Sequence, residues 1–360
     1  DVVVELVGGS DGLAKKIAIS SIKNKKHLIT ANKALIAKHG NLLSILAEKY
    51  KVNLEYEASV AGGVPIIRGI KEGLISNKIF RLIGILNGTS NYILSNMERT
   101  GRNFKDVLKE AQKSGFAESN PKEDLNGQDV ASKIKILSSL CFRSLLSKNK
   151  ILINGIENIE NKDIILAKKL GYRIKLLGIT EINREKIFER VHPALVNINS
   201  YIGNINGVLN AIIINGKKNT QPVVMQGEGA GAVPTTSSLI SDLYSILRGN
   251  INYPFIIPHK ARKKIKCFNF LDYKYSCYFR FEVEDKSGVL SSITKLLAEN
   301  NISIESLIQN PNKKNKTASI VIISHKTLEK NVIKSLKKIK RNKYLIKSPT
   351  FIRVGDVNDN

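Results

Sequence analysis

The first sixty residues alternate between short apolar runs and longer amphipathic segments, and this alternation restricts the fold more than any other feature of the chain. Residues 2–7 are apolar apart from Glu5, and His27–Thr30 and residues 53–59 have the composition of two further strands. The segments between these runs carry apolar residues at helical spacing. Strands that alternate with helices predict a parallel sheet that is covered by helices.

The carboxyl ends of such strands form the edge of the sheet where ligands bind. A complete dinucleotide-binding unit opens with a strand followed by Gly-x-Gly-x-x-Gly, whereas this chain starts at Asp1 and enters an apolar run at once. The Gly-rich segment at 227–231 follows a different run and does not fit that fingerprint. We therefore expect residues 1–60 to form an incomplete Rossmann-type parallel sheet, in an N-terminally truncated chain that lacks the first strands and the phosphate loop. The residues expected at the ligand edge are Gly8, Gly9, Ala31, Asn32 and Lys33.

Residues 61–250 mix strands and helices without a regular βαβ order, which predicts an α+β unit. We place a catalytic and dimerisation domain at 61–236 and a helix that returns to the first unit at 237–250. Pro254, Pro258 and the basic run 260–266 indicate a solvated linker over 251–275.

The C-terminal residues 276–355 follow the order βαββαβ, which predicts a small independent sandwich. Alternating residues from Phe279 to Val283 suggest a half-buried first strand, and residues 344–353 are expected to form the last one. The fold class is therefore α/β plus α+β.

Residues 115–137 concentrate the charged groups suited to chemistry, because an acidic loop leads there into a helix. Asp129 and Lys133 share a helical row with Ile136 and Leu140, which points this pair toward the interior. One reading is an ordinary i,i+4 ion pair worth a few tenths of a kcal/mol. The other is a site for a zwitterionic amino acid, which needs a carboxylate, a cation and an acid or base at the reacting oxygen.

The net charge of +26 does not by itself indicate a nucleic-acid partner. The excess lysines are scattered among many Asn and Ile residues, and aromatic residues do not alternate with the basic runs as stacking platforms would. No apolar run approaches the roughly 20 residues of a membrane span, so neither nucleic acid nor membrane is expected as a partner. Cys141, Cys267 and Cys277 form no even framework, and the default expectation is a reducing cytoplasmic compartment.

Four separated motifs resemble the homoserine dehydrogenase family in the same order. They are Thr-Ala-Asn-Lys at 30–33, Leu-Asn-Gly-Thr-Ser-Asn-Tyr at 86–92, Phe-Ala-Glu-Ser-Asn-Pro-Lys-Glu-Asp-Leu-Asn-Gly-Gln-Asp-Val-Ala-Ser-Lys at 116–133 and Gly-Glu-Gly-Ala-Gly at 227–231. Residues 276–355 look like an ACT domain, a fold that often binds amino acids in regulatory roles. The monofunctional form with a trailing ACT domain fits better than an aspartokinase fusion, in which the dehydrogenase normally comes last.

The resemblance implies an NAD- or NADP-linked interconversion of L-homoserine and L-aspartate 4-semialdehyde in threonine, methionine and isoleucine biosynthesis. It further implies a homo-oligomer, feedback by threonine at the ACT domain and a sodium ion held mainly by main-chain carbonyls. A catalytic lysine acting in the oxidation direction would need a lowered pKa. The implied roles are catalysis by Lys33, Lys133 and Asp129; substrate binding by Glu118, Asp124 and Lys133; cofactor binding by Gly8, Gly9, Ala31, Lys33, Gly229 and Gly231; and sodium binding at Glu57, Val60, Gly62 and Val64.

Other readings of these residues remain open. Lys33 alone would be a solvated lysine at a helix start, Glu57 could pair on a strand edge, and Gly229 and Gly231 could serve a plain turn. His192 is expected to be structural. A non-catalytic protein that binds amino acids for regulation is the alternative function, and the choice between NAD and NADP depends on a residue expected in the missing segment.

Overall fold

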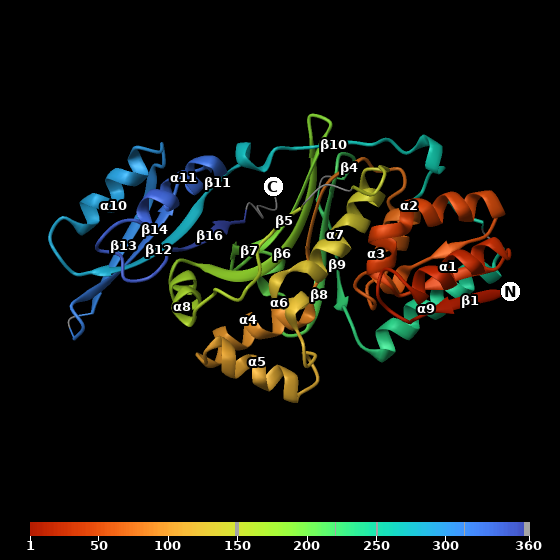
Figure 1. Ribbon diagram of the computed structural model, residues 1–360, viewed down its shortest axis with the longest axis horizontal. Helices are drawn as coiled ribbons and strands as arrows, with labels where there is room; N and C mark the ends of the chain where they lie inside the picture. The colour runs from red at the N-terminus through yellow and green to blue at the C-terminus, as the bar shows by residue number, and fades with distance from the viewer. Residues whose placement is uncertain (148–150, 220, 250, 313, 356–360) are drawn as a thin grey trace.

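The computed structural model describes residues 1–147, 151–219, 221–249, 251–312 and 314–355, which form three units in a row (Figure 1). A small parallel sheet with its helices lies at one end, a large mixed sheet crosses the middle, and the C-terminal unit lies at the other end (Figure 1). The segment that contains β10 (Lys266–Cys267) runs along one side of the molecule from the first unit toward the last (Figure 1).

The N-terminal sheet is parallel, with strand order β1-β2-β3, which confirms the expected architecture of this unit. Helix α9 returns from the middle of the chain and packs against β2. The strand expected over 53–59 is shorter than predicted, because the chain turns into a 3₁₀ helix at Glu57–Ser59. The elements are β1 (Val2–Glu5), α1 (Leu13–Lys23), β2 (His27–Thr30), α2 (Lys33–Tyr50), β3 (Leu54–Glu55) and α9 (Ala232–Leu247).

Among the described residues, the central and C-terminal units share one eleven-stranded sheet. Its path is β13-β14-β12-β16-β7-β6-β4-β8-β9, and β5 and β10 also pair with β7. The helices of the central unit are α3 (Ile66–Arg68), continued by a π-helical turn at Gly69–Gly73, α4 (Gly88–Thr100), α5 (Phe104–Lys113), α6 (Lys122–Asn126), α7 (Gln128–Cys141) and α8 (Asn161–Lys169). Its strands are β4 (Ile79–Ile85), β5 (Leu152–Ile153), β6 (Tyr172–Asn183), β7 (Lys186–Asn197), β8 (Leu209–Gly216) and β9 (Val223–Glu228).

Helix α7 lies directly on the central sheet, and a glycine in β6 permits the close approach. A Cβ at Gly178 would lie 2.6 Å from Cγ1 of Ile134 and 2.7 Å from Cγ1 of Val130. Almost the whole of α7 is therefore buried, which places its first turn inside the molecule rather than on its surface.

The C-terminal unit has the expected βαββαβ order. It comprises β12 (Cys277–Glu284), α10 (Val289–Ala298), β13 (Ile304–Asn312), β14 (Thr317–Ser324), α11 (Glu329–Ile339) and β16 (Thr350–Val354), with a small ladder of β11 (Lys274–Tyr275) and β15 (Thr327–Leu328).

Three expectations about this unit were wrong. The last strand begins at Thr350, because residues 344–349 cross over the unit as a loop. Strand β12 is buried on both faces rather than half-buried, because α8 covers the side opposite the two helices and Asp163 there bonds Arg280 at 2.7 Å. The sandwich is not independent, because β16 pairs in parallel with β7.

The basic run 260–266 contains one arginine that is not solvated, contrary to the prediction. The Arg262 guanidinium lies 4.1 Å from the centroid of the Phe255 ring and donates to the Ser144 carbonyl and the Ser139 hydroxyl. An aromatic face and several oxygen acceptors compensate the loss of hydration. In the described part of the chain, no helix is long and apolar enough to cross a membrane.

Candidate active site

The Asp129 carboxylate is the centre of a buried charged cluster. Its Oδ1 lies 2.9 Å from the Nζ of Lys33, and its Oδ2 accepts a hydrogen bond of 2.8 Å from the Nζ of Lys133. Lys133 also donates to the Leu86 carbonyl at 2.6 Å. The side chain of Asp129 is 5% exposed, so these bonds are made in a poorly solvated place. The structure thus brings together the three residues expected to be catalytic.

The chain reaches this geometry through two helix starts in different units. Gly127, with a φ of 86°, precedes α7 and leaves Asp129 in its first turn. Lys33 is the first residue of α2, whose N-cap Asn32 accepts a hydrogen bond from the Leu35 amide. The pair within α7 is local, whereas Lys33 belongs to the N-terminal unit. The cluster therefore spans two units.

The charges in the cluster shift one another's protonation. Burial raises the pKa of Asp129, but the ammonium groups of Lys133 and Lys33 outweigh it and hold that pKa well below its usual range. Burial lowers the pKa of Lys33, but the carboxylates of Asp129 and Asp124 raise it by more. The lowered pKa that proton acceptance by a lysine would require is therefore not found at Lys33 in this arrangement, because anionic neighbours dominate over desolvation.

Asn87 links Asp129 to Asp124, the second carboxylate expected in the site. Its Nδ2 donates to the Asp124 Oδ1 at 2.7 Å and to the Asp129 Oδ2 at 2.9 Å. Its Oδ1 accepts from the Ser90 amide and caps α4. One buried amide thus holds two carboxylates together, although burial and the charge of Asp129 raise the pKa of Asp124. Sequence reasoning did not assign Asn87, although it lies in one of the four motifs.

Glu118 lies apart from this cluster, on the exposed loop between α5 and α6. The contact described for it is made by its main-chain carbonyl, which accepts from the Gln112 side chain at 3.2 Å. Glu118 is close to Asp124 in sequence. Among the described contacts, the Glu118 carboxylate is not part of the hydrogen-bonded network around Asp129.

The residues expected to bind the cofactor surround the carboxyl end of β1 and the start of α2. Gly8 and Gly9 have φ angles of 80° and 74°, and a Cβ at either residue would meet no atom within 4 Å. The Asn32 side chain donates to the Gly9 carbonyl at 2.6 Å. This backbone is exposed, and because it carries no side chains a ligand can approach it closely.

The turn at 228–231 packs on residues 62–63 and precedes α9. The Gly62 amide donates to the Gly229 carbonyl at 3.0 Å. A Cβ at Gly229 would lie 2.0 Å from the Nδ2 of buried Asn210, so packing against that amide alone explains this glycine. Gly231 has a φ of 119° and is the N-cap of α9, where a residue with a side chain would be strained.

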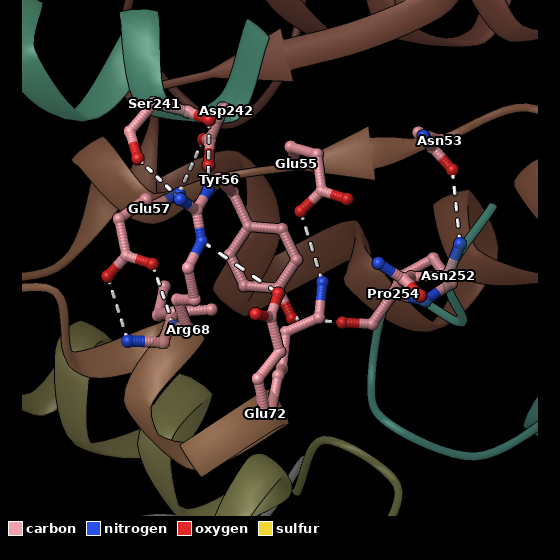
Figure 2. A network of polar contacts seen from close by, with 12 residues as sticks. Asn53, Glu55, Tyr56, Glu57, Arg68, Glu72, Ser241, Asp242, Asn252 and Pro254 are labelled. Atoms are coloured by element: carbon pink, nitrogen blue, oxygen red, sulfur yellow. Dashed lines mark hydrogen bonds and ion pairs between the residues drawn. The ribbon is translucent and has the colours of Figure 1, made fainter. Parts of the chain in front are cut away.

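The Glu57 carboxylate belongs to a polar network that joins three elements (Figure 2). It accepts hydrogen bonds from the amides of Ile67 at 2.8 Å and Arg68 at 2.7 Å, at the start of α3. The Glu57 amide donates to Asp242 of α9, which also pairs with the Arg68 guanidinium at 3.3 Å. Figure 2 shows Arg68 pointing toward Ser241 and Asp242. Burial raises the pKa of Glu57, and burial together with the nearby Glu55 carboxylate raises that of Asp242 to about 7.

This network bears on the sodium site expected at Glu57, Val60, Gly62 and Val64. Each oxygen of the Glu57 carboxylate accepts one amide hydrogen bond, which turns the carboxylate toward the start of α3. The carbonyls of Glu57, Gly62 and Val64 each accept one hydrogen bond, which leaves a second lone pair on each oxygen. Among the described residues, no group of His, Cys, Asp or Glu side chains could hold a metal ion. The residues present fit only a cation bound by main-chain oxygens.

His192 is buried on β7, and its Nδ1 lies 2.9 Å from the Pro193 carbonyl. Burial, with the charges of Arg353 and Arg190, holds its pKa well below the usual value. It lies outside the Asp129 cluster, in agreement with the structural role expected for it.

A carboxylate that holds two ammonium groups, one from a nucleotide-binding-type unit and one from the central unit, is suited to proton transfer at an oxygen beside a hydride acceptor. The chain matches the family model described as "Homoserine dehydrogenase, NAD binding domain" over residues 1–57, "Homoserine dehydrogenase" over 65–244 and "ACT domain" over 278–343. Fold and site together define an NAD(P)-dependent oxidoreductase that carries an ACT domain.

The chain is 41% identical to the homoserine dehydrogenase of Neisseria gonorrhoeae, over 100% of this chain and 83% of that one. It is 39% identical to that of Pseudomonas aeruginosa over 92% of this chain and 78% of that one. A solved homoserine dehydrogenase from Thiobacillus denitrificans superposes with a TM-score of 0.92 at 37% identity, over 99% of this chain and 82% of that one. The chain belongs to the homoserine dehydrogenase family.

Proposed function

We propose that this chain interconverts L-homoserine and L-aspartate 4-semialdehyde at Asp129, Lys33 and Lys133, with NAD or NADP as the hydride carrier. The observation that carries the proposal is the pair of lysines on one buried carboxylate, at 2.9 and 2.8 Å. The nicotinamide supplies the exchange of hydride with C4 of the substrate. The protein's own residues then have to manage the proton on the C4 oxygen and bind the two charged ends of the amino acid.

The lysines are suited to the proton on that oxygen. Because the pKa of Lys33 is raised, its amine is protonated near neutral pH. An ammonium stabilises the negative charge that develops on the carbonyl oxygen during reduction, and it can donate the proton that makes the alcohol. Oxidation of homoserine requires a neutral amine to accept that proton. The raised pKa therefore favours aldehyde reduction near neutral pH and moves the optimum for oxidation toward alkaline pH.

The remaining groups suit the recognition of the amino acid. We assign the substrate ammonium to Asp124 and Glu118, and the orientation of Lys133 to Asp129 and the Leu86 carbonyl. Asp124 of α6 is linked to the cluster by Asn87, and Glu118 lies on the loop that leads into α6. Because Glu118 is exposed and outside the bonded network, its role requires the loop to close over the substrate.

The test is the change in NAD(P)H absorbance with L-homoserine or L-aspartate 4-semialdehyde. The proposal is supported if the absorbance changes only when the nicotinamide cofactor and the amino-acid substrate are both present. The alternative, a non-catalytic amino-acid-binding protein, predicts binding of an amino acid without nucleotide binding. Cofactor titration in the absence of substrate therefore separates the two functions.

We also propose that the nicotinamide cofactor lies along Gly8, Gly9, Ala31 and Lys33, with the turn at Gly229 and Gly231 beside it. The open space at the first two glycines supports this placement. The tight packing of Gly229 on Asn210 supports a plain structural role for that residue as well. Separate measurements of kcat/KM with NAD alone and with NADP alone decide the preference.

A sodium ion on the main-chain carbonyls of Glu57, Val60, Gly62 and Val64 is a separate proposal. Oxygen ligands suit a hard cation. Activity measured in a sodium-free organic buffer, with Na⁺ or K⁺ added back, tests it. Equal rates in all three conditions would exclude a catalytic requirement for the ion.

Regulation and assembly complete the proposal. We infer that the C-terminal unit senses an amino acid, with threonine as the effector, and that the chain forms a homo-oligomer in threonine, methionine and isoleucine biosynthesis. The match to an ACT domain over 278–343 supports the first inference. Inhibition of the full chain by threonine, together with threonine binding in a calorimetric titration, would support it. Light scattering gives the oligomeric state, and growth of a homoserine auxotroph tests the pathway.

A further inference from the structure

The loop between α5 and α6 carries Glu118 on a tip of three exposed residues, 118–120. Both ends of this tip are fixed by main-chain hydrogen bonds. On the α5 side, two successive amides after the helix donate to the Ala111 carbonyl, at 2.9 and 3.1 Å. On the other side, the Pro121 carbonyl accepts from two amides of α6, at 3.1 and 3.0 Å. The tip can therefore change position only by a rearrangement of its own three residues.

The side chain of Gln112 links this tip to α5. Its Nε2 donates to the Glu118 carbonyl at 3.2 Å and to the Ser119 carbonyl at 3.3 Å. A primary amide carries two N–H donors, so the tip uses both of them. Among the contacts described for residues 118–120, these two are the only hydrogen bonds to the rest of the chain. Gln112 therefore sets how firmly the tip is held.

The start of the same loop is tied to α4, the helix whose N-cap Asn87 holds two carboxylates of the site. The Thr89 hydroxyl donates to the Phe116 carbonyl at 2.7 Å, and the Phe116 ring packs on that of Tyr92, with the centroids 4.8 Å apart. Tyr92 in turn donates to Glu110 of α5 at 3.0 Å. Helices α4 and α5, which lie side by side in Figure 1, thus form one frame for the base of the loop and for those carboxylates.

The tip separates the task of its main chain from that of its side chain. Its carbonyls are held by Gln112, whereas the Glu118 carboxylate makes none of the described hydrogen bonds or ion pairs and is available to a ligand. A tip without the Gln112 bonds samples more conformations. The apparent affinity for a ligand falls in proportion to the fraction of molecules in the binding-competent conformation. Holding the main chain of the tip therefore raises affinity without any contact to the reacting atoms.

We propose that Gln112 is a positioning residue for the substrate ammonium, which it serves by fixing the main chain on either side of the Glu118–Ser119 bond. The inference rests on the proposed function, which assigns the substrate ammonium to Glu118 and Asp124. The closure over the substrate that Glu118 requires is then a rearrangement of the tip around the Gln112 amide. Loss of that amide raises the KM of the amino acid and leaves kcat and the KM of the nicotinamide cofactor in place, because the tip takes part in neither hydride nor proton transfer.

Two variants remove the donors from this half-buried position. Gln112→Glu keeps the shape of the side chain and replaces the NH₂ group by an oxygen, and Gln112→Met keeps the length without adding charge. Lys105→Gln is the matched control, because Lys105 is exposed on the same helix, has no described side-chain bond and changes the net charge as Gln112→Glu does. Urea denaturation of each variant reports whether the fold is kept.

The first measurement is the affinity for L-homoserine. Calorimetric titration in the presence of the reduced cofactor, which cannot oxidise homoserine, gives its Kd, and the absorbance assay gives its KM. Both Gln112 variants should raise the Kd and the KM about fivefold or more, as the loss of two hydrogen bonds implies. Their kcat and cofactor KM should stay within about twofold of wild type, and the control should match wild type throughout.

The second measurement is cleavage by a glutamyl endopeptidase, because the bond after Glu118 lies in the tip. The peptide that ends at Glu118, detected by mass spectrometry, should form several times faster in both Gln112 variants than in wild type. Cleavage after exposed Glu185, in the turn between β6 and β7, is the internal reference and should not change. L-Homoserine should slow cleavage after Glu118 in wild type.

The proposal is overturned if cleavage after Glu118 is equal in wild type and both Gln112 variants. It is also overturned if L-homoserine binding is absent or is equal in all three proteins, or if kcat falls by as much as KM rises. A wild type that binds L-homoserine without oxidising it would instead refute the proposed function. The comparisons of Kd and of cleavage would still decide the role of Gln112 in that case, because neither depends on turnover.

Discussion

Replacing Asn87 by Asp separates the two tasks of this side chain. The Asn87 Oδ1 caps α4 through the Ser90 amide, and an aspartate retains that acceptor. Its Nδ2 donates to Asp124 at 2.7 Å and Asp129 at 2.9 Å, and an aspartate loses that donor and adds a third carboxylate. Hydrogen bonds to charged groups contribute about 1.5–3 kcal/mol each, so the loss of both is about 3–6 kcal/mol before any relaxation.

If about half of that loss falls on the transition state, kcat/KM falls on the order of 10²-fold in Asn87→Asp. Lowering the pH should partly restore it, because a protonated carboxyl group regains one donor. Asn87→Ala loses the clamp as well as the cap, which costs about 1 kcal/mol more stability, and it has no group to titrate. Steady-state kinetics from pH 5.5 to 8, with urea denaturation of the same variants, provide the measurement. A kcat/KM within a fewfold of wild type in Asn87→Asp would refute the clamp, and equal pH profiles in the two variants would refute its mechanism.

Three further predictions concern groups around the site. The pKa of Asp242 is about 7 in the folded state, above its unfolded value. Between about pH 4 and 7 only the folded state therefore keeps this proton, and the free energy of unfolding falls as the pH rises through that range. Asp242→Asn should remove this part of the decline in urea melts, and a slope equal to wild type would contradict it. Gly229→Ala places a methyl group against the Asn210 amide and should lower the free energy of unfolding by about 1–3 kcal/mol in the same assay. An unchanged free energy of unfolding would contradict the tight packing of this turn. Asp163→Asn removes the main partner of buried Arg280 and should lower the free energy of unfolding by about 3 kcal/mol. The double variant with Arg280→Met should recover most of that loss. A single variant as stable as wild type would show that the ion pair does not hold the C-terminal unit in place.

Local pattern was enough to predict the elements whose partners are close in sequence. The periodic row in α7 placed Asp129 and Lys133 together in the interior, and the strand-helix alternation predicted the parallel N-terminal sheet. The four motifs indicated that Lys33 belongs to the same site. No local pattern predicted the additional hydrogen bonds that these side chains make to distant segments. One example is the bond that the Lys133 ammonium donates to the Leu86 carbonyl.

Long-range contacts explain the expectations that failed. Arg262 lies in a basic run that reads as solvated, and only tertiary structure supplies Phe255 beneath it. Strand β12 alternates as a half-buried strand should, yet Asp163 from α8 pairs with Arg280 on its supposedly open face. The sequence also did not reveal that the pKa of Lys33 is raised, because its carboxylate neighbours come from another unit and outweigh its burial. Each failure involves a polar group whose partner comes from a distant segment.

We propose that the two lysines held on Asp129 carry the proton chemistry of homoserine oxidation. The most direct measurement is kcat for L-homoserine oxidation in Lys33→Ala and Lys133→Ala, with Lys49→Ala as the control at the exposed far end of the helix that Lys33 begins. We expect a loss of about 10²-fold or more in both site variants, the usual contribution of a positioned acid or base, and a normal rate in the control. A normal rate in either site variant, with the fold intact, would contradict it.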